Sequence, residues 1–513
     1  MPSGVIFGSK GPAAFVDLDQ PSPILALAAV LNSAPFGYLV SAQLARTELA
    51  QSYEVGLIQQ TPVPTIGDTD AKTLSSLARR AWSLKRALDT TAETSHAFVL
   101  PDGLNQSVTG LDPAAIDAEL VAIQREIDDR AFTLYGIGPE DRATIEQASR
   151  STASPDSSDD PDDADEPPDE PALAVPVLPL NSWLVGVAFG RFDPRLATRE
   201  RAIPPEPEPF DPLPSRSPGM WPAGEPRAVP PPAILVDDPG HEHDLVARVE
   251  AAAAPTGSPA PTDLRPWLAR EFFPLHIKMY SKSRRKAPIY WQLATPSASY
   301  SVWLYLHAFT RDTFSRLQND YVAPKLAHEE RRLEALRREH GDSPGAAERK
   351  AVAAQEARVD DLRAFLDEVK RVTPLWNPDL DDGVVINFAP LWRLVPHHRS
   401  WQKELKATWD ALCDGEYDWS HLAMHIWPER VVPKCATDRS LAIAHGLEDI
   451  LWVESTDGKW KPRPAAAVPI AEVLAGLVAE RSSPAVKDAL KSLLGAPSAG
   501  AAAKRTRKGK SDA

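Results

Sequence analysis

The stretch KSRRKAPIYWQLATPSASYSVWLYLHAFTRDTFSRLQNDYVAPKL, residues 282–326, decides how the second half of the chain is organised. It opens with a cluster of Lys and Arg. Two runs rich in aromatic and β-branched residues follow, PIYWQL and SYSVWLYL, and ATPSA joins them. Such residues favour strands, and a short connection with Pro and Ser favours a turn. The sequence therefore predicts a β-hairpin that leads into a charged helix.

The charged helix is predicted from Thr310 to about Val372, with a break at GDSPG (341–345). Gly and Pro interrupt helices, so this segment reads as a helical hairpin. Its apolar residues are spaced for only a thin buried seam.

Helices are the dominant prediction elsewhere, from apolar residues at spacings of three and four. Only VGLIQQTPVP (55–64) reads as a further short strand. The fold class that follows is multi-domain and mainly α, with small mixed or antiparallel β-sheets and a helical hairpin spacer. The predicted helices cover 22–50, 71–91, 113–134, 140–149, 263–281, 400–412, 438–452 and 468–494.

Proline and acidic residues mark the expected domain boundaries. The chain of 513 residues holds 51 prolines, roughly twice the usual share of about 5%. Residues 156–170 hold nine acidic residues and no basic one, a composition typical of disorder. We expect helices in 1–150, an acidic disordered linker at 151–172, a mixed α/β region with the basic-aromatic hairpin at 173–309, the helical hairpin at 310–372, an α-rich region at 373–495 and a disordered basic tail at 496–513.

Charge and cysteine usage limit the class of protein. The net charge is −15, and −6 remains once the acidic linker is set aside. Net charge bears on solubility, whereas local patches decide what binds. Two cysteines form no disulfide framework. Neither a secretory signal nor an apolar run of about 20 residues occurs, so we expect a cytoplasmic protein with no membrane partner.

The cations before the predicted hairpin are the candidate DNA-binding residues, together with the first residues of its first strand. Lys and Arg neutralise phosphates, Arg and Gln can read base edges, and exposed aromatic rings can stack on an unpaired base. The alternative is a solvated positive turn with Tyr290 and Trp291 in the core. The candidate set is Lys278, Lys282, Arg284, Arg285, Lys286, Tyr290, Trp291 and Gln292.

Two sets of residues could ligate a metal, and for both we favour a structural role. HEHD (241–244) has four adjacent residues, which do not converge on one point and fit the first turn of a helix better. Cys413, His421, His425 and Cys435 lack the CxxC spacing of common zinc modules. No metal site is expected.

Methyl transfer requires a glycine-rich turn for S-adenosylmethionine and an Asn/Asp-Pro-Pro-aromatic loop for the extruded adenine, and neither pattern occurs in this sequence. NPDL (377–380) lacks the second proline, and no P-loop is present. We therefore assign no catalytic residue and no bound cofactor, and enzymatic activity of this chain alone is uncertain.

Several segments in order carry a family resemblance: SYEVGLIQQTPVP (52–64), EIDDRAFTLYGIGPEDRATIE (126–146), RRKAPIYWQL (284–293), NDYVAPKL (319–326) and DLDDGVVINFAPL (379–391). With LYLHAFTRDT (304–313) and the run 417–448, they resemble the C-terminal half of PglX-type adenine-specific DNA methyltransferases. These enzymes belong to BREX and DISARM phage-defence systems. Type IIG restriction–modification enzymes are more distantly similar.

The resemblance implies that this chain recognises and holds double-stranded DNA, with residues 1–150 including the end of a target-recognition region. A separate catalytic subunit, or other defence proteins, would then be its partners. S-adenosylmethionine is implied for the complete enzyme. The alternative is an interaction scaffold of a defence complex that does not bind DNA, and a third hypothesis is a self-sufficient methyltransferase.

Overall fold

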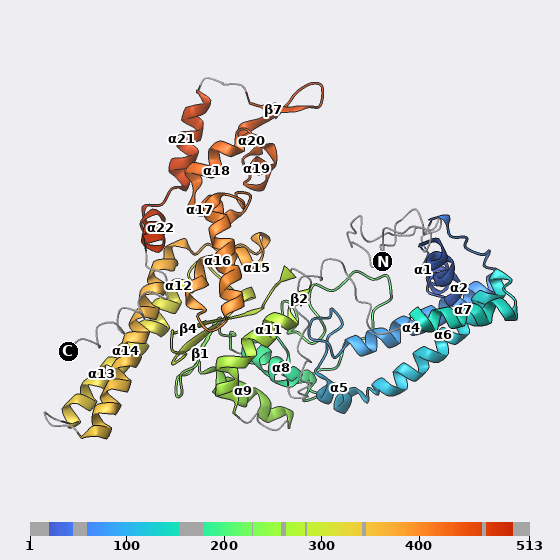
Figure 1. The fold of residues 1–513 in the computed structure, drawn as a ribbon, viewed down its shortest axis with the longest axis horizontal. Coiled ribbons are helices and arrows are strands. Elements are labelled where there is room, and N and C mark those ends of the chain that lie inside the picture. The colour runs from blue at the N-terminus through green and yellow to red at the C-terminus, as the bar shows by residue number, and fades with distance from the viewer. Residues whose placement is uncertain are drawn as a thin grey trace. The chain divides into compact units, whose positions relative to one another are not determined.

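The computed structural model describes residues 20–44, 59–152, 178–227, 229–257, 263–282, 285–340, 345–463 and 468–495. The chain divides into two compact units. Unit 1 comprises Met1–Val229 with Ala252–Pro259, and unit 2 comprises Pro230–Ala251 with Ala260–Ala513. Helices dominate the described residues and the sheets are small and antiparallel, so the predicted mainly α fold class is confirmed (Figure 1).

Unit 1 begins with a helical layer around a core of Ala, Leu, Ile and Val. Ala26, Val30, Leu74 and Ile127 are buried together in it. The single helix predicted over 22–50 is two helices, because the chain turns at Asn32 and Ser33, whose side chains bond back to backbone carbonyls. The helices of this layer are α1 (Pro21–Leu31), α2 (Ala34–Leu44), α4 (Asp68–Asp89), α5 (Asp102–Thr109), α6 (Pro113–Tyr135) and α7 (Pro139–Thr152).

The rest of unit 1 contains α8 (Leu178–Ala188), the short η1 (Pro194–Leu196) and a proline-rich segment. Ion pairs fix it to the helical layer, Arg79 to Glu206 at 2.7 Å and the buried Arg191 to Glu93 at 3.1 Å. The acidic residues 156–170 lie outside the described residues, so the domain boundaries predicted around them stay a prediction.

Gly219 shows how closely this segment approaches the helical layer. Its N–H donates to the carbonyl of Phe98 at 2.7 Å. A Cβ at this position would lie 2.4 Å from the carbonyl oxygen of Val99, so only glycine fits here.

A three-stranded antiparallel sheet in the order β1-β5-β4 forms the centre of unit 2. The predicted hairpin is confirmed as β4 (Tyr290–Ala294) and β5 (Ser301–Tyr305), with Trp291 opposite Leu304. β1 (Ile234–Val236) adds to the free edge of β5, a pairing that was not predicted. Nearly every residue of the three strands is buried, so both faces of the sheet are covered.

Helical segments with aromatic side chains cover this sheet. Phe272 and Phe273 pack on Trp303 of β5, with ring centroids 5.5 and 6.0 Å away. Trp291 of β4 contacts Phe388 at 4.0 Å between centroids. The covering elements include α9 (Leu245–Ala253), α10 (Leu264–Trp267), η3 (Leu268–Phe272), α11 (Phe273–Met279), η7 (Leu380–Asp382), α15 (Val384–Phe388) and η8 (Ala389–Leu394), whereas η2 (Ala254–Thr256) belongs to unit 1.

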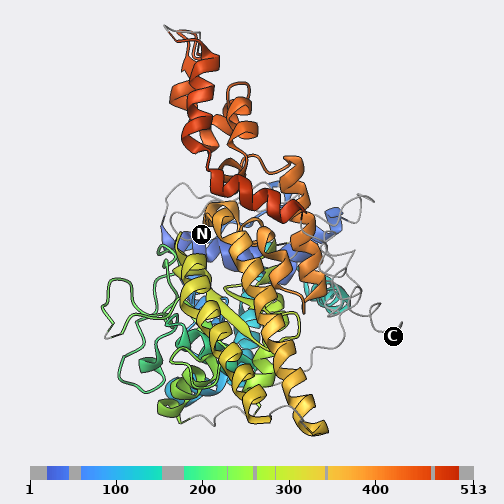
Figure 2. The same ribbon diagram turned by 90° about the vertical axis from the view of Figure 1, so that its left-hand side faces the viewer.

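The charged segment after the sheet is a helical hairpin, as predicted. After η4 (Leu306–Ala308) it runs through α12 (Thr313–Arg316) and η5 (Leu317–Val322) into α13 (Ala323–His340), and returns as α14 (Ala346–Val372). Figures 1 and 2 show α13 and α14 side by side. Arg337–Glu356 and Arg363–Glu330 ion pairs, each 2.6 Å, join them.

A buried lysine fixes the base of this hairpin to the sheet. Lys325 of α13 contacts Asp238, just after β1, at 2.7 Å and Glu329 at 2.8 Å. Glu329 is almost fully buried and also accepts from Gln355 of α14 at 2.7 Å. We call these four residues the Lys325 cluster; it joins β1, α13 and α14.

The C-terminal region is helical. Unit 2 also contains two further two-stranded antiparallel sheets, one directly before β4 and one in the C-terminal region. The helix predicted over 468–494 is two helices, separated at Ser482 and Ser483 before a proline. The remaining elements are β2 (Ser281–Lys282), β3 (Arg285–Lys286), η6 (Thr373–Leu375), α16 (Arg399–Asp414), α17 (His421–Ile426), α18 (Pro428–Cys435), α19 (Arg439–Ala444), α20 (Glu448–Leu451), β6 (Trp452–Glu454), β7 (Trp460–Pro462), α21 (Ile470–Arg481) and α22 (Pro484–Gly495).

Among the described residues, no single helix has both the length and the apolar character to cross a membrane. The pair α1 and α2 reaches that composition only jointly, across a bend of 61°.

Leu304→Ala tests the central position of β5. Leu304 is fully buried, so we expect the free energy of unfolding of unit 2 to fall by about 2–5 kcal/mol, since deleting core methyls leaves a cavity. Urea unfolding with hydrogen exchange of β4 and β5 measures the change. The control Ile443→Ala removes a side chain that is 51% exposed and should change stability by less than about 0.5 kcal/mol.

Candidate nucleic-acid interface

The three residues predicted to contact bases are buried in the core of unit 2. Tyr290 and Trp291 have no exposed surface, and Gln292 is 2% exposed. The expectation that they stack on or read bases is therefore wrong for this structure. The alternative, that Tyr290 and Trp291 belong to the core, is correct, because both faces of β4 are covered.

The predicted cations lie before β4. Lys278 is exposed near the end of α11. Lys286 lies on β3 and pairs with Glu404 of α16 at 2.7 Å. The side chains of Lys282 and Arg285, and all of Arg284, lie outside the described residues. Contact of these five cations with DNA stays a prediction.

An open groove of about 470 Å³ lies beside Lys286. Pro274 and Ile277 of α11 form one side, and the start of α16 with the segment before it forms the other. Lys286 and Arg399 bring two cations to it from elements more than a hundred residues apart in sequence. The lining residues are Pro274, Ile277, Lys286, His397, His398, Arg399, Ser400 and Trp401.

Hydrogen bonds of the buried Gln292 side chain fix the position of the segment before α16 that lines this groove. Its Oε1 lies 3.0 Å from Nε2 of His398, and its Nε2 donates to the carbonyl of Ala269 at 3.1 Å. Next to His398, His397 places Nε2 2.8 Å from the carbonyl oxygen of Thr295 at the end of β4. The segment that carries Arg399 is thus held at two points, one on β4 and one directly after it.

Burial keeps His398 uncharged. Desolvation, with a smaller repulsion from His397, lowers the pKa of His398 to about 4. The neutral ring has one N–H, and on Nε2 this hydrogen can be donated to Gln292 Oε1. Since His398 carries no charge near neutral pH, it adds no positive charge to the groove, whereas Lys286 and Arg399 do.

The first turn of α16 adds backbone donors to the groove. His398 occupies the N-cap position, and no side chain caps this end. The first amides of a helix have no acceptor within the helix, and the helix dipole makes this end partly positive. Arg399 and Lys403 are exposed on this turn and the next. Anions bind readily at such ends.

Sequence reasoning missed Arg399 and Ser400. HHRS (397–400) directly before an amphipathic helix was the available signal. Without the contact of His398 with Gln292, nothing connected this segment to Lys286.

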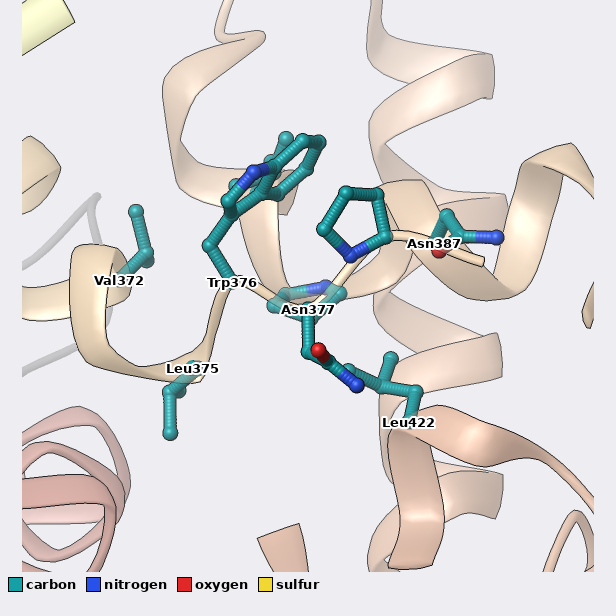
Figure 3. A pocket seen from close by; sticks show the side chains of 9 residues that line it. Val372, Leu375, Trp376, Asn377, Asn387 and Leu422 are labelled. Atoms are coloured by element: carbon teal, nitrogen blue, oxygen red, sulfur yellow. The ribbon is translucent and has the colours of Figure 1, made fainter. Parts of the chain in front are cut away.

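The second cavity of interest adjoins Asn377 and Pro378, the motif that lacks a second proline. Its volume is about 10 Å³, room for a single water molecule. Figure 3 shows Asn377 pointing towards Leu422 of α17, while Trp376 and Leu375 project to opposite sides of the chain. An adenine ring does not fit in this cavity.

The sets weighed as metal ligands have other contacts. His421 Nδ1 lies 2.9 Å from buried Asp382, and His425 Nε2 lies 3.2 Å from the carbonyl oxygen of Pro374. Asp244, of the HEHD segment, accepts from Ala247 N–H in the first turn of α9, as expected of a helix N-terminus. No group of three or more His, Cys, Asp or Glu suited to a metal occurs among the described residues.

Comparison with known proteins finds two adenine-specific methyltransferases. A segment of 144 residues, 27% of this chain, is 26% identical to adenine-specific methyltransferase BrxX of Escherichia coli O9:H4 (strain HS). A segment of 140 residues, 26% of the chain, is 26% identical to adenine-specific methyltransferase PglX of Lacticaseibacillus casei (strain Zhang). These segments span 12% and 11% of the two proteins. No family model matches. About a quarter of the chain is thus related to adenine-specific methyltransferases.

His398→Gln tests the burial of neutral His398. In the unfolded chain, His398 binds a proton near pH 6.5, whereas in the folded protein it does so only near pH 4. The free energy of unfolding therefore decreases as the pH is lowered through this range. Between pH 7 and pH 5, wild type should lose about 2 kcal/mol more unfolding free energy than the variant, measured by urea unfolding.

His421→Gln is the matched control of opposite sign. Burial opposes the charge on His421, but its bond to Asp382 outweighs burial and raises its pKa. His421 therefore stabilises the fold below the unfolded pKa of about 6.5 and less as pH rises through its folded pKa. On acidification, the free energy of unfolding of this variant should fall by more than that of wild type. Equal pH responses of the His398→Gln and His421→Gln variants would contradict the opposite pKa shifts of the two histidines.

Proposed function

We propose that this chain is the DNA-engaging part of a site-specific N6-adenine DNA methyltransferase of the BREX or DISARM type. In this proposal it binds double-stranded DNA, and residues outside this sequence bind S-adenosylmethionine and transfer the methyl group. Those residues would belong to a separate catalytic subunit or to other proteins of a phage-defence system.

The relationship to BrxX and PglX supports the enzyme class. It extends over about a quarter of this chain and a small part of each relative. The target-recognition role, the double-stranded DNA partner and the missing catalytic residues are the finer parts of the proposal. They rest on the ordered sequence blocks and on the absence of the methyl-transfer patterns from these 513 residues.

The groove at α16 is the observation that carries the DNA-binding part. Two cations from distant segments line it, together with an uncapped helix end, although the chain as a whole is acidic at −15. Phosphate contacts dominate the affinity of proteins for DNA, and Lys, Arg and helix N-termini make them. The cations and the uncapped helix end of this groove suit the negative charge of a sugar-phosphate backbone.

Removing the two groove cations should weaken DNA binding and its salt dependence together. For Lys286→Ala/Arg399→Ala we expect the slope of log affinity against log salt to become shallower by about 2, because each phosphate contact contributes roughly 0.9. Fluorescence anisotropy with a labelled DNA duplex, at salt concentrations from about 50 to 200 mM, measures this slope.

Arg331→Ala/Arg338→Ala is the matched control, because it removes two exposed arginines from α13 of the same unit. It should leave the slope within error of wild type. A wild-type chain with no affinity for duplex DNA at low salt, alone or with its catalytic partner, would favour the alternative of a scaffold that does not bind DNA.

A further inference from the structure

One face of the β6–β7 hairpin carries only cations. Successive side chains of a strand point to opposite faces, so Lys459, Lys461 and Arg463 share one face of β7 and its two flanking positions. All three residues are exposed. We propose that this face contacts the sugar-phosphate backbone of a DNA duplex, in addition to the groove at α16. The inference rests on the proposed function, because it names a second contact of the same chain with DNA.

The alternation holds because backbone hydrogen bonds continue past both ends of β7. Ser455 N–H donates to the carbonyl of Lys459, and Arg463 N–H donates to the carbonyl of Leu451, each at 2.8 Å. Two residues of an antiparallel strand rise by about 7 Å, so the three cations follow one another along the hairpin at regular intervals.

The opposite face of the hairpin packs on helices. Trp452 lies on this face, is only 8% exposed, and donates through Nε1 to the carbonyl of Cys435 in α18 at 2.9 Å. Trp460 lies on the same face, and Cζ of Arg439 in α19 is 4.1 Å from its ring centre. The cationic face is therefore turned to solvent. Figure 1 shows the hairpin projecting beyond α19 and α20.

The acidic residues of the hairpin leave the cationic face uncompensated. Glu454 lies opposite Trp460 in the ladder, and directly opposite residues of two strands point to the same face. Its carboxylate is thus on the helix side. Asp457 lies in the turn, where it accepts from the hydroxyl of Ser455, and this bond lowers the pKa of Asp457.

The two lysines of this face are free to bind an anion. Within the part of the chain that the structure describes, neither the Lys459 nor the Lys461 ammonium group has a hydrogen bond or an ion pair. The chain carries a net charge of −15, so a face with cations alone is complementary to a polyanion rather than to another copy of this acidic chain.

The side chains of this face suit phosphates better than bases. Lysine contacts phosphate as a point charge, whereas base edges are read mainly by Asn, Gln and the free fork of Arg. Residues 452–463 contain no Asn or Gln, and Arg463 donates to the carbonyl of Asp449 at 2.7 Å. A two-stranded ribbon also has the dimensions to lie in the major groove of B-DNA. We therefore expect contacts that do not depend on the DNA sequence.

Lys459→Ala/Lys461→Ala in the full chain tests the surface. Fluorescence anisotropy with two labelled duplexes of unrelated sequence, at about 50 to 200 mM salt, measures affinity and its salt dependence. We expect affinity to fall roughly tenfold and the slope of log affinity against log salt to become shallower by about 2. Both duplexes should show the same change. Lys461→Ala alone should change the slope by about half as much.

Two further variants separate a local contact from general charge. Lys459→Arg/Lys461→Arg keeps the charge and should keep the affinity and slope of wild type. Lys487→Ala/Lys491→Ala removes the same charge from exposed positions of α22 and should leave both within error of wild type. The urea unfolding midpoint should be the same for all variants, because these side chains are exposed.

The remaining outcomes would overturn the inference. Equal losses for Lys459→Ala/Lys461→Ala and Lys487→Ala/Lys491→Ala would show that overall charge is responsible. Unchanged duplex affinity together with association into larger species on sedimentation would show that the lysines only protect an exposed strand edge.

A comparison with the groove variant keeps the inference separate from the proposed function. If Lys286→Ala/Arg399→Ala weakens duplex binding and the hairpin variant does not, the proposed function stands and this inference falls. A wild-type chain with no duplex affinity, alone or with its catalytic partner, overturns both.

Discussion

The hydrogen bonds of Gln292 are the constraint on which the candidate interface depends. This buried amide on β4 links the carbonyl of Ala269 on η3 with His398 at the start of α16. A buried amide without partners is costly, so the two neighbouring elements cannot move away from β4 independently. The bond between His397 and the carbonyl of Thr295, the residue directly after β4, adds a second attachment. The groove thus owes its position to the sheet behind it.

The sequence allowed the hairpin to be predicted but not its burial. Alternating aromatic and β-branched residues indicate strands, and β4 and β5 form as expected. Alternation does not say whether a second layer covers the other face. Here the segment around Phe388 packs on Trp291, while Phe272 and Phe273 pack on Trp303. The aromatic residues that resembled a base-stacking surface are therefore core residues.

Of the candidate site, local reasoning could find only Lys286. The other cation, Arg399, is 113 positions further along the chain, and a tertiary contact brings the two together. Likewise, β1 has only three residues, too few for a strand signal, and its pairing with β5 depends on the assembled sheet. Predictions from sequence succeeded where spacing within one segment decides the structure. They failed where the structure depends on a contact with a segment that is distant in the sequence.

The Lys325 cluster has a consequence for the behaviour of the helical hairpin in acid. Burial of Glu329 disfavours its charge, but bonds from Lys325 and Gln355 outweigh this and lower its pKa to about 2. The carboxylate accordingly keeps its charge in the folded protein throughout mildly acidic conditions, and its stabilising contribution is lost progressively as the pH falls from the ordinary pKa of a glutamate towards that value. The root of the hairpin should therefore stay anchored to the sheet in a mildly acidified compartment or eluate.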